Sequence, residues 1–149
     1  DVVERMLTLA RVGPDDVVYD LGCGDGRIVI MAAQRFGARA VGVDIDPRLI
    51  AEAEANARAA GVEGRVEFRL EDALTTDVSD ATVVTLYLLS ASNVALRPIL
   101  TKQLRAGARI VSHNFAIGDW EPHVVDTFRD AAGAARTLYL WNVDGVYRP

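Results

Sequence analysis

Short apolar runs alternate with segments of helical periodicity along the first two thirds of this chain. Residues 1–10 carry apolar side chains at helical spacing, which predicts an amphipathic helix. Further predicted strands cover 17–21, 40–43, 66–70, 81–88 and 108–111, and predicted helices cover 27–36, 47–60 and 93–105. Pro98 predicts a late start or a kink for the last of these helices. Strands alternating with helices are typical of an α/β fold with a doubly wound, parallel sheet.

The last third of the chain departs from this alternation. The sequence predicts a loop over 118–123 and two strands, over 124–129 and 137–143. The Gly/Ala-rich link between these strands is too short for a parallel crossover, so we expect an antiparallel hairpin. The sequence therefore predicts a single-domain, Rossmann-like α/β fold over 1–149, whose mostly parallel sheet ends in an antiparallel hairpin.

Composition narrows the function classes. The 149 residues carry a net charge of -5, which argues against a nucleic-acid partner, because phosphate binding needs an excess of Lys and Arg. The longest apolar run, 81–89, is too short to span a bilayer. Cys23 is the single cysteine, which excludes an internal disulfide and favours a cytoplasmic protein. Two histidines and this cysteine predict no metal site. The chain begins with Asp1, so we expect upstream residues to be missing.

The run V-V-Y-D-L-G-C-G-D-G at 17–26 is the strongest functional signal. An apolar strand ends near Asp20, and a glycine turn leads into the helix 27–36. The turn contains three glycines, Gly22, Gly24 and Gly26. Strand, glycine turn and helix N-terminus together predict a site for a nucleotide-like ligand, which the backbone of the glycines can approach closely.

Two residues argue against a dinucleotide in this turn. Arg27 stands where G-x-G-x-x-G has its third glycine, and Asp20 would repel a pyrophosphate. A carboxylate suits a ligand with an ammonium group, such as S-adenosylmethionine, which has no phosphate. Asp44 ends the next strand, where its carboxylate can accept both ribose hydroxyls. The alternative role for Asp44, capping the following helix, already belongs to Asp46. Ile45 can lie against the adenine face.

The pattern resembles motif I of the class I, seven-strand S-adenosylmethionine-dependent methyltransferases, and the resemblance covers 2–143. It implies that Asp72 hydrogen-bonds the adenine amino group and that Ala73 gives a backbone contact. The runs D-L-G-C-G-D-G-R-I-V-I, V-T-L-Y-L-L, R-I-V-S-H-N-F and D-W-E-P are similar to the small protein-lysine methyltransferases of archaeal and mitochondrial type. The likeness implies a lysine acceptor. The Asn/Asp-Pro-Pro-aromatic motif of base-methylating relatives is missing from 85–89, which argues further against nucleic acid.

Tyr87 and His113, at the ends of predicted strands, are the candidate catalytic residues. The Tyr87 hydroxyl can hydrogen-bond an amine, and His113 can accept or relay a proton. The alternatives are a buried tyrosine and a structural histidine. Asn114, Phe115 and Trp120 are candidates for the acceptor pocket, and Trp141 is expected in the core.

Three other functions stay open at this point. A small-molecule methyltransferase would usually carry a lid or cap domain, and this chain has almost no insertion that could form one. A non-catalytic partner subunit that binds S-adenosylmethionine would keep the same motifs. An NAD-linked oxidoreductase is disfavoured by Arg27 and Asp20.

Overall fold

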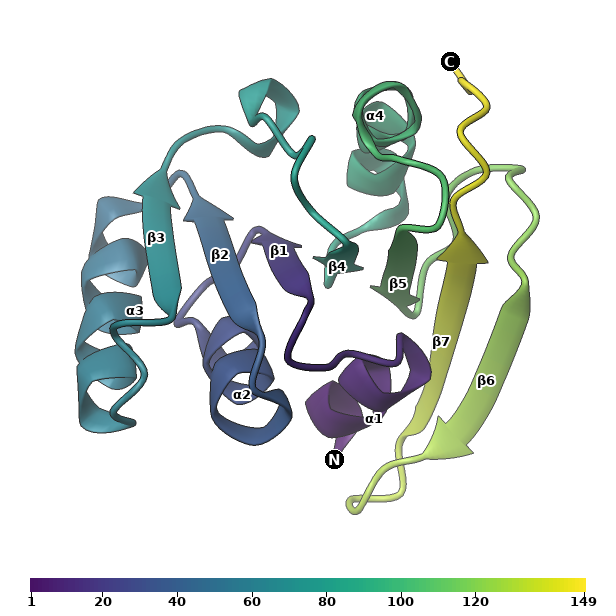
Figure 1. Cartoon of the computed structure of the whole chain (residues 1–149). Helices are drawn as coiled ribbons and strands as arrows, with labels where there is room; N and C mark the ends of the chain where they lie inside the picture. The colour runs from purple at the N-terminus through teal and green to yellow at the C-terminus, as the bar shows by residue number, and fades with distance from the viewer.

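The computed structural model describes residues 1–149 as a seven-stranded sheet with helices on both faces (Figure 1). The strands are β1 (Val17–Leu21), β2 (Arg39–Asp44), β3 (Val66–Leu70), β4 (Val83–Leu86), β5 (Arg109–His113), β6 (Val124–Arg129) and β7 (Ala135–Asn142). The helices are α1 (Val2–Leu9), α2 (Arg27–Phe36), α3 (Pro47–Ala59), α4 (Ser90–Gln103) and the 3-10 turn η1 (Ala73–Thr75). None of the helices combines the length and the apolar character needed to cross a bilayer.

The strand order β3-β2-β1-β4-β5-β7-β6 confirms the predicted fold class. The first five strands are parallel, whereas β7 runs antiparallel to both β5 and β6. The direction of winding reverses between β1 and β4, which are neighbours in the sheet. Open α/β sheets bind their ligands at such a reversal, outside the carboxyl ends of the strands.

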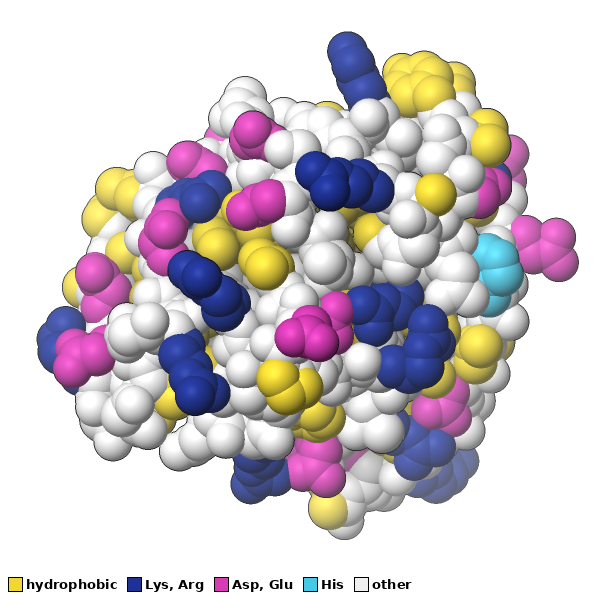
Figure 2. Space-filling view, viewed as in Figure 1, with side chains coloured by type: hydrophobic (Ala, Val, Ile, Leu, Met, Phe, Trp, Pro, Cys, Tyr) yellow, Lys and Arg dark blue, Asp and Glu magenta, His cyan; other side chains and the backbone are white.

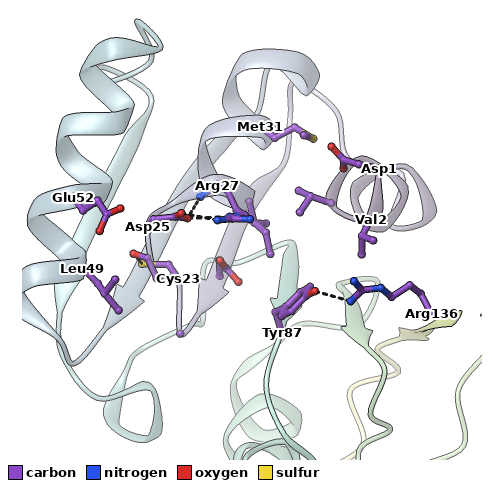
Figure 3. A pocket seen from close by; sticks show the side chains of 15 residues that line it. Asp1, Val2, Cys23, Asp25, Arg27, Met31, Leu49, Glu52, Tyr87 and Arg136 are labelled. Carbon is purple, nitrogen blue, oxygen red and sulfur yellow. Dashed lines mark hydrogen bonds and ion pairs between the residues drawn. The ribbon is translucent and has the colours of Figure 1, made fainter. Parts of the chain in front are cut away.

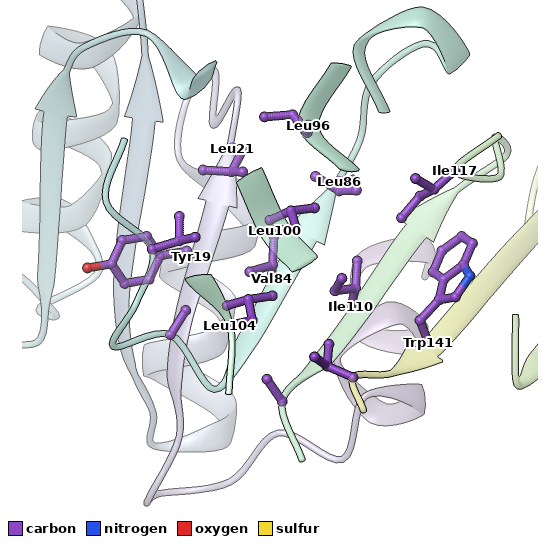
Figure 4. Packing of buried hydrophobic residues seen from close by; sticks show 14 of the residues in the cluster. Tyr19, Leu21, Val84, Leu86, Leu96, Leu100, Leu104, Ile110, Ile117 and Trp141 are labelled. Atoms are coloured by element: carbon purple, nitrogen blue, oxygen red, sulfur yellow. The ribbon is translucent and has the colours of Figure 1, made fainter. Parts of the chain in front are cut away.

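Two apolar layers pack on the two faces of the sheet. Leu96 and Leu100 of α4 cover the face that carries Tyr19, Leu21 and Leu86 (Figure 4). On the opposite face, α1 and α2 pack against the strand side chains that point away from α4. This second layer includes Met6, Ile28, Val18, Val83 and Leu138. Trp141 is fully buried in the first layer, as expected. Both layers leave the carboxyl edge of the parallel strands free for a site.

The prediction was wrong by one to three residues at several boundaries, and three of these lie near the carboxyl edge of the sheet. Strand β4 ends at Leu86, two residues early, because its pairing with β1 and β5 ends there. Helix α4 begins at Ser90, before the predicted start, and contains Pro98 in its interior. Strand β5 continues to His113, which pairs with Leu138 of β7. The antiparallel partner extends β5 beyond the parallel part of the sheet.

Candidate active site

The glycine turn after β1 lies directly on β2. The amides of Gly22 and Cys23 both donate to the Val43 carbonyl, at 2.8 and 2.9 Å. Gly22, Gly24 and Gly26 have φ of +81°, +55° and +85°, the left-handed region that other residues rarely adopt. A Cβ built on Gly42 would lie 2.8 Å from the Cys23 sulfur. The local sequence therefore forms this turn because it has glycine at each strained or crowded position.

Asp20 is a buried carboxylate at the base of this turn. Asp20 is only 1% exposed. Its Oδ1 accepts a hydrogen bond of 2.8 Å from the Thr85 hydroxyl. Burial raises the pKa of Asp20 to about 7. The charge of Asp44 adds to this rise, and the Thr85 hydrogen bond opposes it. Asp20 lines the larger of two cavities at the site, so a cationic ligand there would favour the ionised form.

Two cavities meet at Gly22, which lines both. The larger, about 810 Å³, extends along the turn towards α1, α3 and the end of β4 (Figure 3). The smaller, about 430 Å³, is lined by the predicted residues Asp44, Ile45, Asp72 and Ala73 together with Leu88 and Leu96. The structure thus brings every predicted cofactor residue to one of two joined cavities, except Gly26, which forms the N-terminus of α2.

The two predicted carboxylates of the smaller cavity also hold local structure. Asp44 accepts from the amides of Gly24 and Asp46, at 2.9 and 3.0 Å, and so joins the glycine turn to the start of α3. Asp46 caps α3 by accepting from the Arg48 amide. Asp72 caps η1 by accepting from the Leu74 amide at 2.9 Å. Each of Asp44 and Asp72 keeps oxygen lone pairs beside the cavity for a ligand.

These features fit S-adenosylmethionine. The larger cavity offers the buried Asp20 carboxylate, whose Oδ2 forms no hydrogen bond within the protein, to an ammonium group. The smaller cavity offers apolar walls and carboxylates to an adenine and a ribose. When bound, this cofactor supplies a methyl group on a cationic sulfonium. Asp20 would hold its amino-acid part, and Asp44, Ile45, Asp72 and Ala73 would hold its adenosine.

Cys23 belongs to the turn but not to the chemistry. The side chain is buried, and burial together with the charges of Asp20 and Asp44 raises the pKa of the thiol to about 12. A thiol of such a high pKa is not a nucleophile at neutral pH. No group of three or more His, Cys, Asp or Glu side chains is placed to hold a metal ion.

Tyr87 lies just beyond β4, at the larger cavity, and is 43% exposed. It is therefore not the buried strand tyrosine of the alternative interpretation. Its ring stacks on that of His113, with centroids 3.9 Å apart and planes 4° from parallel. His113 is 6% exposed; burial and, to a smaller extent, the charge of Arg136 lower its pKa. The two predicted catalytic residues are in direct contact.

Arg136 also lies at this site, although the sequence pattern did not predict it. It lines the larger cavity from β7, and its Nη1 lies 3.2 Å from Tyr87 Oη (Figure 3) and 3.0 Å from His113 Nε2. The alternation of inward and outward side chains along β7 could have indicated Arg136 as unusual. Arg136 occupies the same face as the buried Leu138 and Leu140, where an apolar side chain would be expected.

None of the other three acceptor-pocket candidates, Asn114, Phe115 and Trp120, lines either cavity. Asn114 has φ of +64° and holds the end of β5 to β7, because its amide and its Oδ1 both bond to Thr137. Phe115 next to it is partly exposed. Trp120 lies in the core, where its carbonyl accepts from the Trp141 indole, and lines neither cavity.

Known proteins share this arrangement. The ANTKMT methyltransferase domain matches residues 20–124. A protein-lysine N-methyltransferase of Saccharolobus islandicus is 48% identical over 141 residues, which are 94% of this chain and 87% of that protein. The adenine nucleotide translocase lysine N-methyltransferase of mouse is 36% identical over 83% of this chain, which spans about half (53%) of the mouse protein.

A solved structure matches nearly the whole fold. It is an RNA methyltransferase from Salinibacter ruber in complex with S-adenosyl-L-homocysteine, 51% identical, with a TM-score of 0.91 over 99% of this chain and 93% of the other. S-adenosyl-L-homocysteine is what S-adenosylmethionine becomes on losing its methyl group. The archaeal and mouse proteins are named for a lysine acceptor, whereas the Salinibacter protein is named for RNA.

Proposed function

Because the chain belongs to the ANTKMT methyltransferase domain family and is thereby an S-adenosylmethionine-dependent methyltransferase, we propose that it methylates the side-chain amine of lysine in a protein. The observation that carries the lysine acceptor is the 48% identity, over 94% of the chain, to a protein-lysine N-methyltransferase. The mouse relative is named for a lysine acceptor as well.

The charges of the larger cavity support a cationic acceptor. Four of its lining residues are acids, Asp1, Asp20, Asp25 and Glu52, and two are arginines, Arg27 and Arg136. Both guanidinium groups are already engaged by carboxylates, Arg27 by Asp25 at 2.8 Å and Arg136 by Asp130 at 2.9 Å. With Asp25 paired to Arg27 and Asp20 assigned to the cofactor, the carboxylates of Asp1 and Glu52 are left without a guanidinium partner. Their negative charge attracts a lysine side chain before its ammonium loses a proton.

A protein must solve two problems to methylate lysine. The free amine has a pKa of about 10.4, so holding it neutral near pH 7 costs about 4–5 kcal/mol. It must also be aligned with the methyl group, and alignment can contribute about 7–11 kcal/mol. The cavity between the glycine turn, Tyr87 and Arg136 is where this chain can do both.

RNA is the second candidate acceptor, on the strength of the Salinibacter structure. The surface charges count against it. The chain has 21 acidic and 16 basic residues, and on the face shown in Figure 2 the two signs are interspersed, with no continuous basic surface. RNA binding relies on basic surface that neutralises phosphates.

The experiment is methyl transfer from labelled S-adenosylmethionine into a cell extract, divided between protease and ribonuclease treatment. We expect the label to be lost to protease, to survive ribonuclease, and to map to methylated lysine by mass spectrometry. Label lost to ribonuclease would assign RNA instead, and label confined to small molecules would contradict both macromolecular acceptors. The Asp20→Asn variant should transfer little label, with Asp15→Asn as the matched control, since Asp15 is exposed and lines neither cavity.

A further inference from the structure

Arg136 connects the terminal hairpin to both predicted catalytic residues. Its Nε donates to Asp130 Oδ2 at 2.9 Å, and its Nη1 reaches Tyr87 Oη and His113 Nε2. Asp130 is fixed in turn, because its Oδ1 accepts from the amides of Ala132 and Ala134 in the β6–β7 turn. The guanidinium is therefore held from the hairpin side while its other end lies at the larger cavity.

This contact determines the protonation of His113. Arginine stays charged and only donates, so His113 Nε2 must be the acceptor in the 3.0 Å contact and Nδ1 must carry the ring proton. The pKa of His113 is lowered by burial and by the charge of Arg136. The Nε2 lone pair, which could take a proton from a substrate, is engaged by Arg136.

The same contact fixes the orientation of Tyr87. The phenol is held by stacking on His113 and by the Arg136 hydrogen bond to Oη. A phenol oxygen has two lone pairs, so Oη can accept from Arg136 and from an N–H of a neutral amine together. An amine bound in this way keeps its own lone pair free to accept a methyl group.

We propose that Arg136 is the positioning residue of the acceptor site: it holds Tyr87 for a hydrogen bond from the substrate amine and keeps His113 from acting as the proton acceptor. This inference rests on the proposed lysine acceptor. The lysine ammonium then releases its proton to solvent, and the neutral amine forms the new N–C bond while the electron pair of the broken S–C bond stays on sulfur. The charge of Arg136 adds to this by disfavouring the ammonium form nearby.

The kinetic test compares Arg136→Gln and Arg136→Lys with Arg129→Gln. Arg129 is an exposed arginine of the same hairpin that donates only to the Gly133 carbonyl and lines neither active-site cavity. For a lysine-containing protein substrate, we expect Arg136→Gln to lower kcat about 10–100-fold. Arg136→Lys should recover part of this loss, and Arg129→Gln should leave kcat unchanged. Calorimetry should give the same Kd for S-adenosylmethionine, within about twofold, in all three. Arg136→Gln activity equal to that of Arg129→Gln would overturn the proposal.

The pH dependence separates positioning from proton transfer. In the wild type, activity should rise with pH as the lysine ammonium loses its proton, and Arg136→Gln should move this rise to higher pH. His113→Asn should lower the rate without changing the shape of the profile. If His113→Asn removes a limb of the profile, His113 is the proton acceptor and the proposal is wrong.

A measurement without substrate gives an independent readout. The chain has two histidines, so NMR can follow the His113 ring against His123, which bonds to the Asn142 amide away from Arg136. Arg136→Gln should raise the His113 pKa and leave the ring resonances of His123 in place, whereas an unmoved His113 pKa would refute the contact. If the shift is seen but the wild type methylates no lysine, the proposed function fails and the Arg136–His113 contact stands.

Discussion

The ionised carboxylate of Asp20 destabilises the ligand-free protein, because it is buried. Its carboxylate is buried with one hydrogen-bond donor, so the neutral acid is the better form and its pKa is raised to about 7. A cationic ligand beside it reverses this preference. We propose that Asp20 serves ligand binding at the expense of stability, as polar groups at functional sites often do.

Asp20→Asn should stabilise the ligand-free protein and weaken cofactor binding. The folded pKa of about 7 exceeds the unfolded value of about 3.9, so protonation stabilises the fold fully below pH 4, and this contribution is lost as the pH rises through 7. At pH 8 we expect a higher Tm than wild type, from a gain of about 1–4 kcal/mol, and a difference that shrinks towards pH 5.

The same variant tests the ligand. At pH 8, calorimetry should show S-adenosylmethionine binding about 10–100-fold weaker in Asp20→Asn, because a charge-assisted hydrogen bond contributes about 1.5–3 kcal/mol. Wild-type affinity should fall below pH 7, as the acid takes up its proton. Asp15→Asn is the control for both measurements, and an Asp20→Asn affinity equal to that of Asp15→Asn would remove Asp20 from the site.

Asp44 and Asp46 are neighbouring carboxylates with separable roles. Asp44→Ala removes the acceptor of the Gly24 and Asp46 amides as well as the predicted ribose partner, so we expect a loss of about 1–3 kcal/mol in stability and of about 1.5–3 kcal/mol in cofactor binding. Asp46→Ala removes a helix cap, which costs about 1 kcal/mol, and should leave binding unchanged. Chemical denaturation and calorimetry on both variants distinguish these outcomes; equal effects on binding would contradict the assignment of Asp44.

At the scale of elements, the most predictable segment runs from β1 through β2. Strand β1 and helix α2 have their predicted bounds, because the apolar run, the glycines and the Gly37 stop agree with one another. Strand β4 was less predictable. Its sequence continues apolar to Leu89, but the strand ends at Leu86, where its pairing with β1 and β5 ends. Tertiary pairing, rather than local pattern, thus places Tyr87 at the cavity instead of in the sheet.

Gly42 of β2 makes room for the glycine turn. It lets β2 pass beneath the turn, since an added Cβ would lie 2.8 Å from both the Cys23 sulfur and Phe68 Cδ1. Gly42→Ala should cost about 1–3 kcal/mol of stability through overpacking, measured by denaturant unfolding. Gly64→Ala, where nothing lies within 4 Å, should be close to neutral. Combining Gly42→Ala with Cys23→Ala should recover the part of the loss that the sulfur causes; no recovery would assign the loss to Phe68 and to the Cys23 Cβ, which lies 2.9 Å away and is kept in alanine.

At the scale of the whole molecule, the hairpin completes a site that the parallel strands begin. The sequence predicted the hairpin and the turn, but not that residue 136 would reach Tyr87, 49 positions away. This proximity depends on the register of β7 with β5 and β6, which pairs His113 with Leu138 and Phe128 with Arg136. Local periodicity carries no information about such a register between distant segments.

Ligand binding should stabilise the molecule as one unit. S-adenosylmethionine at a hundred times its Kd should add about 2.7 kcal/mol to the stability, which raises the Tm of a domain of this size by about 5–10 °C. NAD at the same concentration should leave the Tm unchanged, because Asp20 at the turn opposes a pyrophosphate. Thermal unfolding measured with each ligand in turn gives the two Tm shifts. A Tm shift with NAD but not with S-adenosylmethionine would contradict the cofactor site.

Because the two cavities meet at Gly22, we expect the cofactor to bind as two separable fragments. Adenosine should occupy the smaller cavity and methionine the larger, each as an independent fragment of low affinity. The covalent link between the fragments turns the second binding event into an intramolecular one, at an effective concentration in the millimolar range or above. An inhibitor could therefore be grown from either side, by tethering an adenosine-like group to an amine that reaches past Tyr87.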